Sequence, residues 1–211
     1  MLISKCKKSF YVLLLLFFSF TILNAQTYSK NGMVVSSDKS SSEVGANILK
    51  KGGNAIDAAV ATAFSLAVTH PSAGNIGGGG FIVFMNSEGN TTTIDFREKA
   101  PLKATNDMYL DATGNVIDGI NHKTALSIGV PGTVAGLYLA HEKYGKLPWK
   151  DVVQPAVDQA KNGFAFNWSL YRAAQYFTGD DSTGPFMDDY FRNEKGVIVE
   201  PGELWKQNEL A

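Results

Sequence analysis

Three charged side chains in the segment IDFREKAP are the residues of this sequence best placed for chemistry. Asp95, Arg97 and Glu98 follow a run of β-forming residues, so they are expected at the end of a strand. A guanidinium is a planar, two-pronged donor that matches a carboxylate, which a lysine ammonium does not. On these residues alone the favoured partner of Arg97 is Asp95 or Glu98 in a structural ion pair, and the alternative is a carboxylate of a ligand.

A row of four glycines lies upstream, in HPSAGNIGGGGFIVF, and raises the alternative of a phosphate site. Phosphate loops place their glycines after a strand and before a helix, so that the helix N-terminus faces the anion. Here the order is reversed, since an apolar helix precedes the glycines and a strand beginning at Phe81 follows them. We therefore expect the row to let backbone segments pass close together rather than to bind a nucleotide.

The elements expected to position these residues begin with two helices. Asn54 is expected to cap a helix from Ala55 to Val68, which must be buried on several sides because it is apolar nearly all round. Asp57 is expected to serve the same cap, with a catalytic aspartate as the alternative. Ahead of this helix, the segment NGMVVSSD predicts a short strand, and the residues from Ser42 predict another helix.

After the glycines, the segment FIVFMNSEGNTTTIDFR predicts a hairpin that turns at residues 87–90. Three later segments predict helices: VPGTVAGLYLAHEKYG, capped by Thr133 and stopped by Gly145; PWKDVVQPAVDQAKNG, broken or kinked at Pro155; and WSLYRAAQYF, capped by Asn167. The end of the chain, VIVEPGELW and KQNELA, predicts two strand pieces joined by a Pro-Gly turn and then the start of a helix.

Residues 1–25 have the pattern of a secretory signal peptide. Three lysines precede an apolar run too short to span a bilayer, and cleavage is expected after Ala25, which leaves residues 26–211. The one cysteine, Cys6, lies in this leader, so the mature chain has no thiol. Loss of three lysines and no acid changes the formal net charge from −1 to −4, which disfavours nucleic-acid binding. We expect a periplasmic or secreted protein with no membrane attachment after cleavage.

No other catalytic motif stands out. The sequence contains neither a GxSxG elbow nor an HExxH zinc motif. The histidines His70, His122 and His141 are scattered, and each is expected to be a surface or capping residue. No metal site and no organic cofactor are expected.

The order of these motifs resembles the start of the large subunit of the gamma-glutamyltransferases, also called gamma-glutamyl transpeptidases. The likeness runs from about Gly32 to Ala211 and rests on AVTHPSAGNIGGGGF, the hairpin with DFREKAP, PGTVAG and VVQPA, in that order. It implies an α+β fold of the N-terminal-nucleophile hydrolase superfamily, an αββα sandwich. Residues 26–211 would form an incomplete N-terminal portion of the large subunit.

The resemblance also implies a reaction. Members of the family cut their own proenzyme before a threonine, whose new amine can serve as the base for its own hydroxyl. This threonine attacks γ-glutamyl amides such as glutathione, and water or an amino acid or peptide then takes the γ-glutamyl group from the acyl-enzyme. The nucleophile and the glycine pair of the oxyanion hole lie far downstream in the family. No catalytic residue is therefore expected in this chain, and Thr69-His70 matches only the family's helix end.

Arg97 is the substrate-binding residue that the resemblance transfers, as the group that would hold the α-carboxylate of a γ-glutamyl substrate. Glu98 would be an orienting or structural partner. The expected partners are the remainder of the large subunit and the small subunit, and this chain alone is expected to be inactive. Two alternatives remain open: an acylase branch that cleaves glutaryl or related side chains from β-lactam precursors, and a noncatalytic relic or γ-glutamyl-binding module.

Overall fold

The computed structural model describes residues 28–178, 189–193 and 195–211 of the protein, and the expected leader lies outside them. The chain divides into two units, residues 1–33 and 34–211. In the first unit, the described residues 28–33 form neither a helix nor a strand. Among the described helices, none has the length and apolar character needed to cross a membrane.

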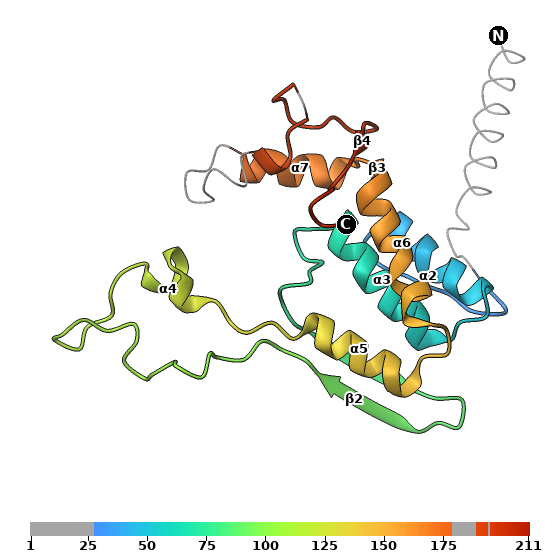
Figure 1. Ribbon diagram of the computed structural model, residues 1–211, viewed down its shortest axis with the longest axis horizontal. Coiled ribbons are helices and arrows are strands. Elements are labelled where there is room, and N and C mark those ends of the chain that lie inside the picture. Colours follow the sequence, from blue (N-terminus) through green and yellow to red (C-terminus); the bar gives the residue numbers. More distant parts are fainter. Residues whose placement is uncertain (1–27, 179–188, 194) are drawn as a thin grey trace, which may run out of the picture. The chain divides into compact units, whose positions relative to one another are not determined.

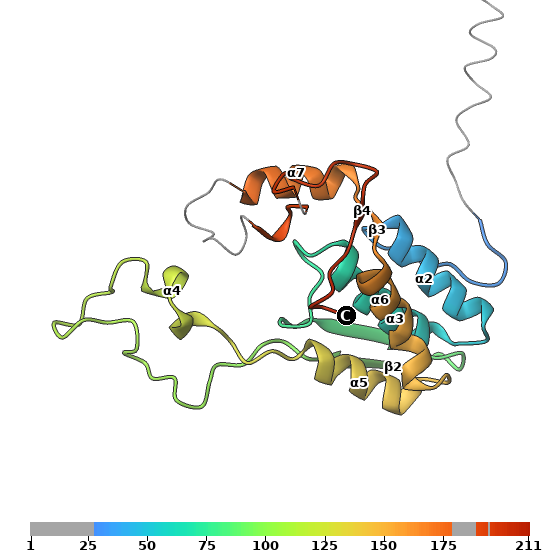
Figure 2. The ribbon, with the colours of Figure 1, turned by 45° about the horizontal axis from the view of Figure 1, so that its top comes forward.

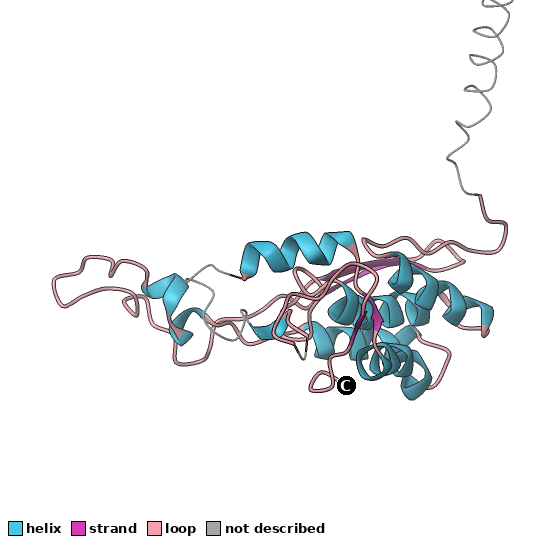
Figure 3. Ribbon diagram, turned by 90° about the horizontal axis from the view of Figure 1, so that it is seen from above, coloured by secondary structure: helices cyan, strands magenta, loops and turns pink. Residues whose placement is uncertain are grey.

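The second unit contains every helix and strand that the structure describes (Figure 1). Helices and loops make up most of it, and the strands are short (Figure 3). In chain order the elements are α2 (Lys39–Lys50), α3 (Ala55–Thr69), β1 (Phe81–Met85), β2 (Thr91–Asp95), α4 (Ile120–Lys123), the 3₁₀ helix η1 (Ala125–Ser127), α5 (Thr133–Tyr144), α6 (Trp149–Asn162), β3 (Phe164–Ala165), α7 (Trp168–Phe177) and β4 (Leu204–Trp205).

The apolar helix α3 forms the centre of this unit, as its composition predicts. Asn54 caps it, since its side-chain oxygen accepts the backbone N–H groups of Ile56 and Asp57, each at 3.0 Å. Helices α2, α5 and α6 pack against α3, and Figure 2 shows α2 and α6 beside it. Only Ala55 and Ala59 of α3 are exposed, so the predicted burial on several sides is confirmed.

The predicted hairpin is confirmed, with β1 and β2 antiparallel and Phe81 opposite Asp95. Burial alternates along both strands. The inward side chains Ile82, Phe84 and Ile94 pack against the core that α3 and α5 share, whereas the outward ones are exposed. The hairpin therefore ends with Asp95 on its outer face and the next residue, Phe96, directed into the core.

A second apolar cluster surrounds the small sheet of β3 and β4. Its buried members include Phe166 and Trp205, whose rings meet edge to face at a centroid distance of 5.2 Å. Asn167 caps α7 as predicted, because its side-chain oxygen accepts the N–H of Leu170 at 2.9 Å. Only the second predicted strand piece, Leu204–Trp205, is a strand, and it pairs with β3 rather than with the first piece.

The predicted strand NGMVVSSD and the predicted terminal helix are wrong. The backbone N–H of Ser36 bonds to the Ser42 hydroxyl at 2.9 Å, so this segment is held by the first turn of α2 rather than by a strand partner. That helix begins at Lys39, earlier than predicted, because Asp38 caps it. At the other end, Gln207 is buried and its side chain donates to the carbonyl of Val68, which holds the last residues in a turn.

Two predictions about α5 and α6 also need correction. Gly145 ends α5 as expected, but Thr133 does not cap it, since Gly132 occupies the cap position and the Thr133 hydroxyl bonds elsewhere. Of the break or kink predicted at Pro155, the break is wrong, because α6 runs unbroken across that residue. A proline removes only one helical hydrogen bond, and burial of Val152 and Ala156 on either side stabilises the helix across that gap.

Candidate functional site

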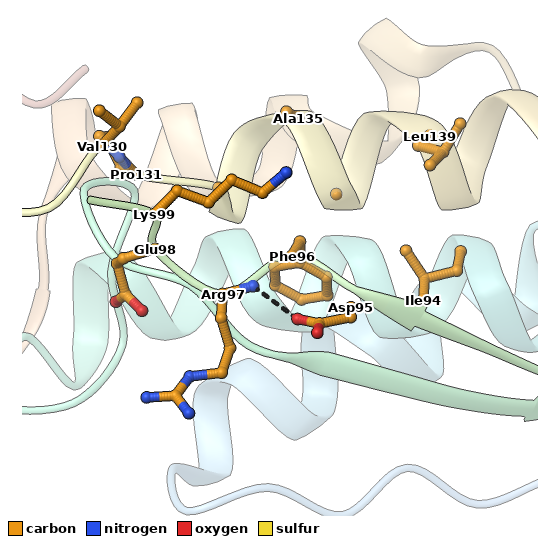
Figure 4. Close-up of a pocket in the computed structure, with 12 residues that line it drawn as sticks. Ile94, Asp95, Phe96, Arg97, Glu98, Lys99, Val130, Pro131, Ala135 and Leu139 are labelled. Atoms are coloured by element: carbon orange, nitrogen blue, oxygen red, sulfur yellow. Dashed lines mark hydrogen bonds between the residues drawn. The ribbon is translucent and has the colours of Figure 1, made fainter. Parts of the chain in front are cut away.

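The candidate site lies at the end of β2, where the chain leaves the hairpin. The N–H of Phe96 donates to the carbonyl of Gly80 at 3.0 Å, which extends the hairpin pairing by one residue. The N–H of Arg97 donates to the carboxylate of Asp95 at 3.0 Å (Figure 4). This bond fixes the backbone at Arg97 while its side chain remains exposed.

Glycines on two separate segments allow other backbone to approach this strand end. A Cβ at Gly79 would lie 2.7 Å from the Cα of Arg97, and one at Gly132 would lie 2.1 Å from the carbonyl oxygen of Phe96. A Cβ at Gly136, one turn further along α5, would lie 2.2 Å from the Phe96 ring. The predicted role of the glycine row, close backbone approach, is therefore confirmed at Gly79.

A pocket of about 460 Å³ opens beside this strand end, between β2 and α5 (Figure 4). Its apolar lining comes from side chains such as Ile94, Val130 and Leu139, and its charged lining comes from Asp95, Arg97, Glu98 and Lys99. The Arg97 and Lys99 side chains extend in different directions from the backbone (Figure 4). A second hollow of about 510 Å³ adjoins the first and shares Glu98 and Lys99 with it.

The Arg97 guanidinium makes no ion pair or hydrogen bond with any residue that the structure describes. The carboxylate of Asp95 bonds the backbone of Arg97 instead of its side chain, and Glu98 is exposed. The ion pairs found in the described ranges join Lys39 to Glu43 and His141 to Asp57. The structural ion pair expected from the residues alone is therefore not formed, and the five N–H donors of Arg97 are available to a ligand.

Asp57 is a structural residue, in agreement with the capping role expected for it. It is 0% exposed, and its carboxylate accepts the N–H of Asn54 at 2.9 Å, of Lys146 at 3.0 Å and of Leu147 at 3.3 Å. The Nε2 atom of His141 lies 3.5 Å from the same carboxylate. Backbone donors thus enclose both oxygens, which leaves neither free to act as a catalytic base.

Three threonines near the glycine row and in the hairpin, Thr69, Thr91 and Thr93, have no hydrogen bond to a histidine or a carboxylate in the described structure. Thr69 is 1% exposed, and its hydroxyl is 2.7 Å from that of Ser41 in a buried polar network. Thr91 and Thr93 lie exposed on the outer face of the hairpin. Across the described ranges no three His, Cys, Asp or Glu side chains gather as metal ligands.

Sequence reasoning missed the contribution of α5 to this site. Gly132 and Gly136 are four residues apart, so they lie on one face of a helix and leave that face open to close approach. That spacing within PGTVAG was a usable signal. The contact of Asn75 with Thr133, across 58 residues of sequence, had no such signal.

Comparison with known proteins gives consistent results. A family model described as gamma-glutamyltranspeptidase matches residues 41–211. The chain is 55% identical over 183 residues to the glutathione hydrolase proenzyme of Escherichia coli (strain K12). The aligned residues make up 86% of this chain and 30% of that relative. The chain thus spans less than a third of that relative's length.

Solved structures agree. The crystal structure of Helicobacter pylori gamma-glutamyltranspeptidase matches with a TM-score of 0.80 and 41% identity, over 88% of this chain and 53% of that one. A cephalosporin acylase from Bacillus halodurans matches with a TM-score of 0.70 and 29% identity, over 87% of this chain and 35% of that one. The predicted fold class is confirmed: the fold is α+β and is shared with N-terminal-nucleophile hydrolases. The chain therefore belongs to the gamma-glutamyltranspeptidase family, a family of enzymes.

Proposed function

We propose that this chain supplies the carboxylate-binding part of a gamma-glutamyltransferase, an enzyme that hydrolyses glutathione and other γ-glutamyl compounds and transfers the γ-glutamyl group to amino acids or peptides. The observation that carries the proposal is Arg97, an arginine without an ion-pair partner in the described structure, beside a pocket of about 460 Å³. Family membership gives this arrangement a substrate class, since γ-glutamyl compounds present a free α-carboxylate.

The chemistry of the site suits that substrate. A guanidinium binds a carboxylate through two parallel N–H···O bonds, and such charge-assisted bonds are about twice as strong as neutral ones. The backbone of Arg97 is held by Asp95 and by the close approach of Gly79, which limits the backbone entropy lost when a ligand binds. Glu98 shares the rim of the pocket, and we propose that it orients the substrate or supports Arg97.

The rest of the active site is proposed to come from outside this chain. The threonine nucleophile that forms the acyl-enzyme, and the oxyanion hole, would be supplied by the remainder of the large subunit and by the small subunit. Residues 1–25 are proposed to be a cleaved signal peptide that directs residues 26–211 to the periplasm or the exterior. The similarity to proenzymes supports a product that must be processed.

The acylase branch is the rival with a specific observation behind it, the likeness to a cephalosporin acylase. A glutaryl group ends in the same kind of carboxylate as a γ-glutamyl group but lacks the α-ammonium. Arg97 would serve both, so the discriminating measurement is kcat/KM of the complete enzyme for γ-glutamyl and glutaryl anilides. We expect kcat/KM to be higher for the γ-glutamyl anilide. A higher kcat/KM for the glutaryl anilide would favour the acylase. Binding of γ-glutamyl compounds without turnover would instead indicate a noncatalytic module.

The substitution Arg97→Lys in the complete enzyme tests the role of Arg97. Lysine keeps the charge but loses the two-pronged geometry, so KM for a γ-glutamyl anilide should rise about 10- to 100-fold while the melting temperature stays unchanged. Arg172→Lys on the exposed part of α7 is the matched control and should leave KM unchanged. An unchanged KM for Arg97→Lys would remove Arg97 from the substrate site.

A further inference from the structure

We propose that Asn75 and Thr133 are positioning residues for Arg97, and that they act by locking the glycine row to the N-terminus of α5. We call Asn75, Gly78, Gly132 and Thr133 together the Asn75 latch. The inference rests on the proposed function, because it assigns these residues to the carboxylate-binding role of Arg97. Neither residue lines the pocket that Arg97 borders.

The latch is centred on one side-chain oxygen. The Oδ1 atom of Asn75 accepts the N–H of Gly78 at 2.8 Å and the hydroxyl of Thr133 at 2.6 Å. Thr133 is only 6% exposed, so loss of the bond to Asn75 would leave a largely buried hydroxyl without the partner it has in the described structure. Thr133 is the first residue of α5, after the cap position at Gly132, and its hydroxyl bonds to Asn75.

A second set of bonds makes the connection two-sided. The carbonyl oxygen of Gly78 accepts the N–H of Gly132 at 2.8 Å and the N–H of Thr133 at 3.0 Å. The first N–H groups of a helix have no partner within the helix, so these bonds satisfy donors that would otherwise be unpaired. The glycine row and the start of α5 are therefore joined both through backbone and through side chains.

The latch reaches Arg97 through van der Waals contact. Gly79 lies against the backbone from Phe96 to Glu98, where a Cβ would be 2.7 Å from the Phe96 oxygen and 2.8 Å from the Glu98 nitrogen. Gly132 approaches the same Phe96 oxygen from the side of α5. The backbone that carries Arg97 thus lies between two segments that Asn75 and Thr133 hold together. A shift of either segment would move the Cα atom of Arg97 and with it the guanidinium.

The test compares the steady-state kinetics of the complete enzyme with and without the substitution Thr133→Val. Valine replaces the hydroxyl by a methyl group and keeps the shape of the side chain. We expect KM for a γ-glutamyl anilide to rise about three- to ten-fold with kcat within about two-fold of wild type. Thr133→Ser keeps the hydroxyl and should restore the wild-type KM. Thr62→Val is the matched control, because Thr62 is similarly buried at 7% and its hydroxyl donates to the carbonyl of Ala58 in α3, outside the site.

The double variant separates positioning from general destabilisation. If Thr133 acts through Arg97, adding Thr133→Val to Arg97→Lys should change KM little further, whereas independent effects would multiply. A full multiplicative effect, or an equal rise in KM for Thr62→Val, would overturn the latch. Should Thr133→Val fail to fold, Asn75→Ala carries the same prediction from a half-buried loop.

Failure of the latch and failure of the proposed function give different results. If Arg97→Lys raises KM and Thr133→Val and Asn75→Ala do not, the latch is wrong and the role of Arg97 stands. If Arg97→Lys has the wild-type KM, the proposed role of Arg97 is wrong and the latch falls with it.

Discussion

The carboxylate of Asp57 at the start of α3 is buried among backbone donors, whereas the guanidinium of Arg97 at the end of β2 is exposed without a partner in the described structure. Asp57 joins the cap of α3 to the loop between α5 and α6, since it accepts N–H groups from residues 54, 146 and 147. The backbone of Arg97 is held by its bond to Asp95 and by the close approach of Gly79, whereas its guanidinium makes no ion pair in the described structure. The contrast separates a charge that bonds within the fold from a charge that we propose binds the carboxylate of a ligand.

The largest predicted effect is the difference in stability between Asp57→Ala and Arg97→Ala. Removing the buried Asp57 carboxylate takes the acceptor from the backbone N–H groups of Asn54, Lys146 and Leu147, which should cost about 3–5 kcal/mol in the free energy of unfolding. Removing the Arg97 side chain should change that free energy by less than about 0.5 kcal/mol. Urea unfolding of the complete protein measures both changes.

Asp57→Asn refines this comparison, since the amide keeps one acceptor oxygen. Its free energy of unfolding should lie between those of Asp57→Ala and wild type. Comparable losses for Asp57→Ala and Arg97→Ala would contradict the distinction, because Arg97 would then stabilise the fold as Asp57 does.

The next largest effect concerns the packing of the glycine row against the Arg97 backbone. Two glycines of that row, Gly79 and Gly77, serve as the test position and its control. A Cβ at Gly79 would overlap the backbone at Arg97, so Gly79→Ala should cost about 1–3 kcal/mol and raise KM for γ-glutamyl substrates. A Cβ at Gly77, two residues earlier, would meet nothing within 4 Å, so Gly77→Ala should be close to neutral. Thermal unfolding with kinetics tests the pair, and equal behaviour of the two variants would show that the row is not packed as described.

The smallest effect comes from Asp111, which is exposed like Arg97 yet hydrogen-bonded like Asp57. Its pKa is lowered from the ordinary value of 3.8, chiefly because its carboxylate accepts the Thr113 hydroxyl at 2.7 Å and also the N–H groups of Asn115 and Thr113. Because the folded pKa is the lower one, the contribution to stability is present above pH 3.8 and is lost as the pH falls through the folded pKa.

Thr113→Val should therefore raise the pKa of Asp111 toward its ordinary value, as followed by an NMR titration, with little change in melting temperature near neutral pH. A large loss of melting temperature would mean that an exposed, locally bonded carboxylate stabilises this fold as a buried one does.

Much of the fold was predictable because its signals are local. The cap at Asn54, the apolar character of α3 and the alternation along the hairpin each follow from a few neighbouring residues. The errors arose where a hydrogen bond to another segment decided the outcome, across six residues of sequence in one case and 139 in the other. The Ser42 hydroxyl accepts the N–H of Ser36, so residues 31–38 do not form the predicted strand. The carbonyl of Val68 accepts a bond from the Gln207 side chain, so the last residues do not form the predicted helix.

The candidate site also has a part that could be predicted from the sequence and a part that could not. The guanidinium at the end of a strand was identifiable from the segment DFREKAP, and the resemblance of the ordered motifs identified the family. The absence of a structural ion pair at Arg97 could not be read from the sequence, because Asp95 and Glu98 are close enough along the chain to form one. Their failure to do so follows from the turn of the backbone after β2, where Asp95 accepts the Arg97 N–H.

The most direct test of the account is a crystal structure of the complete protein with L-glutamate, the product of the proposed hydrolysis. We predict that the α-carboxylate accepts two N–H bonds of about 2.7–2.9 Å from the Arg97 guanidinium, beside the pocket between β2 and α5. A bound glutamate whose α-carboxylate is held by other residues, with the Arg97 side chain still directed to solvent, would contradict the central claim.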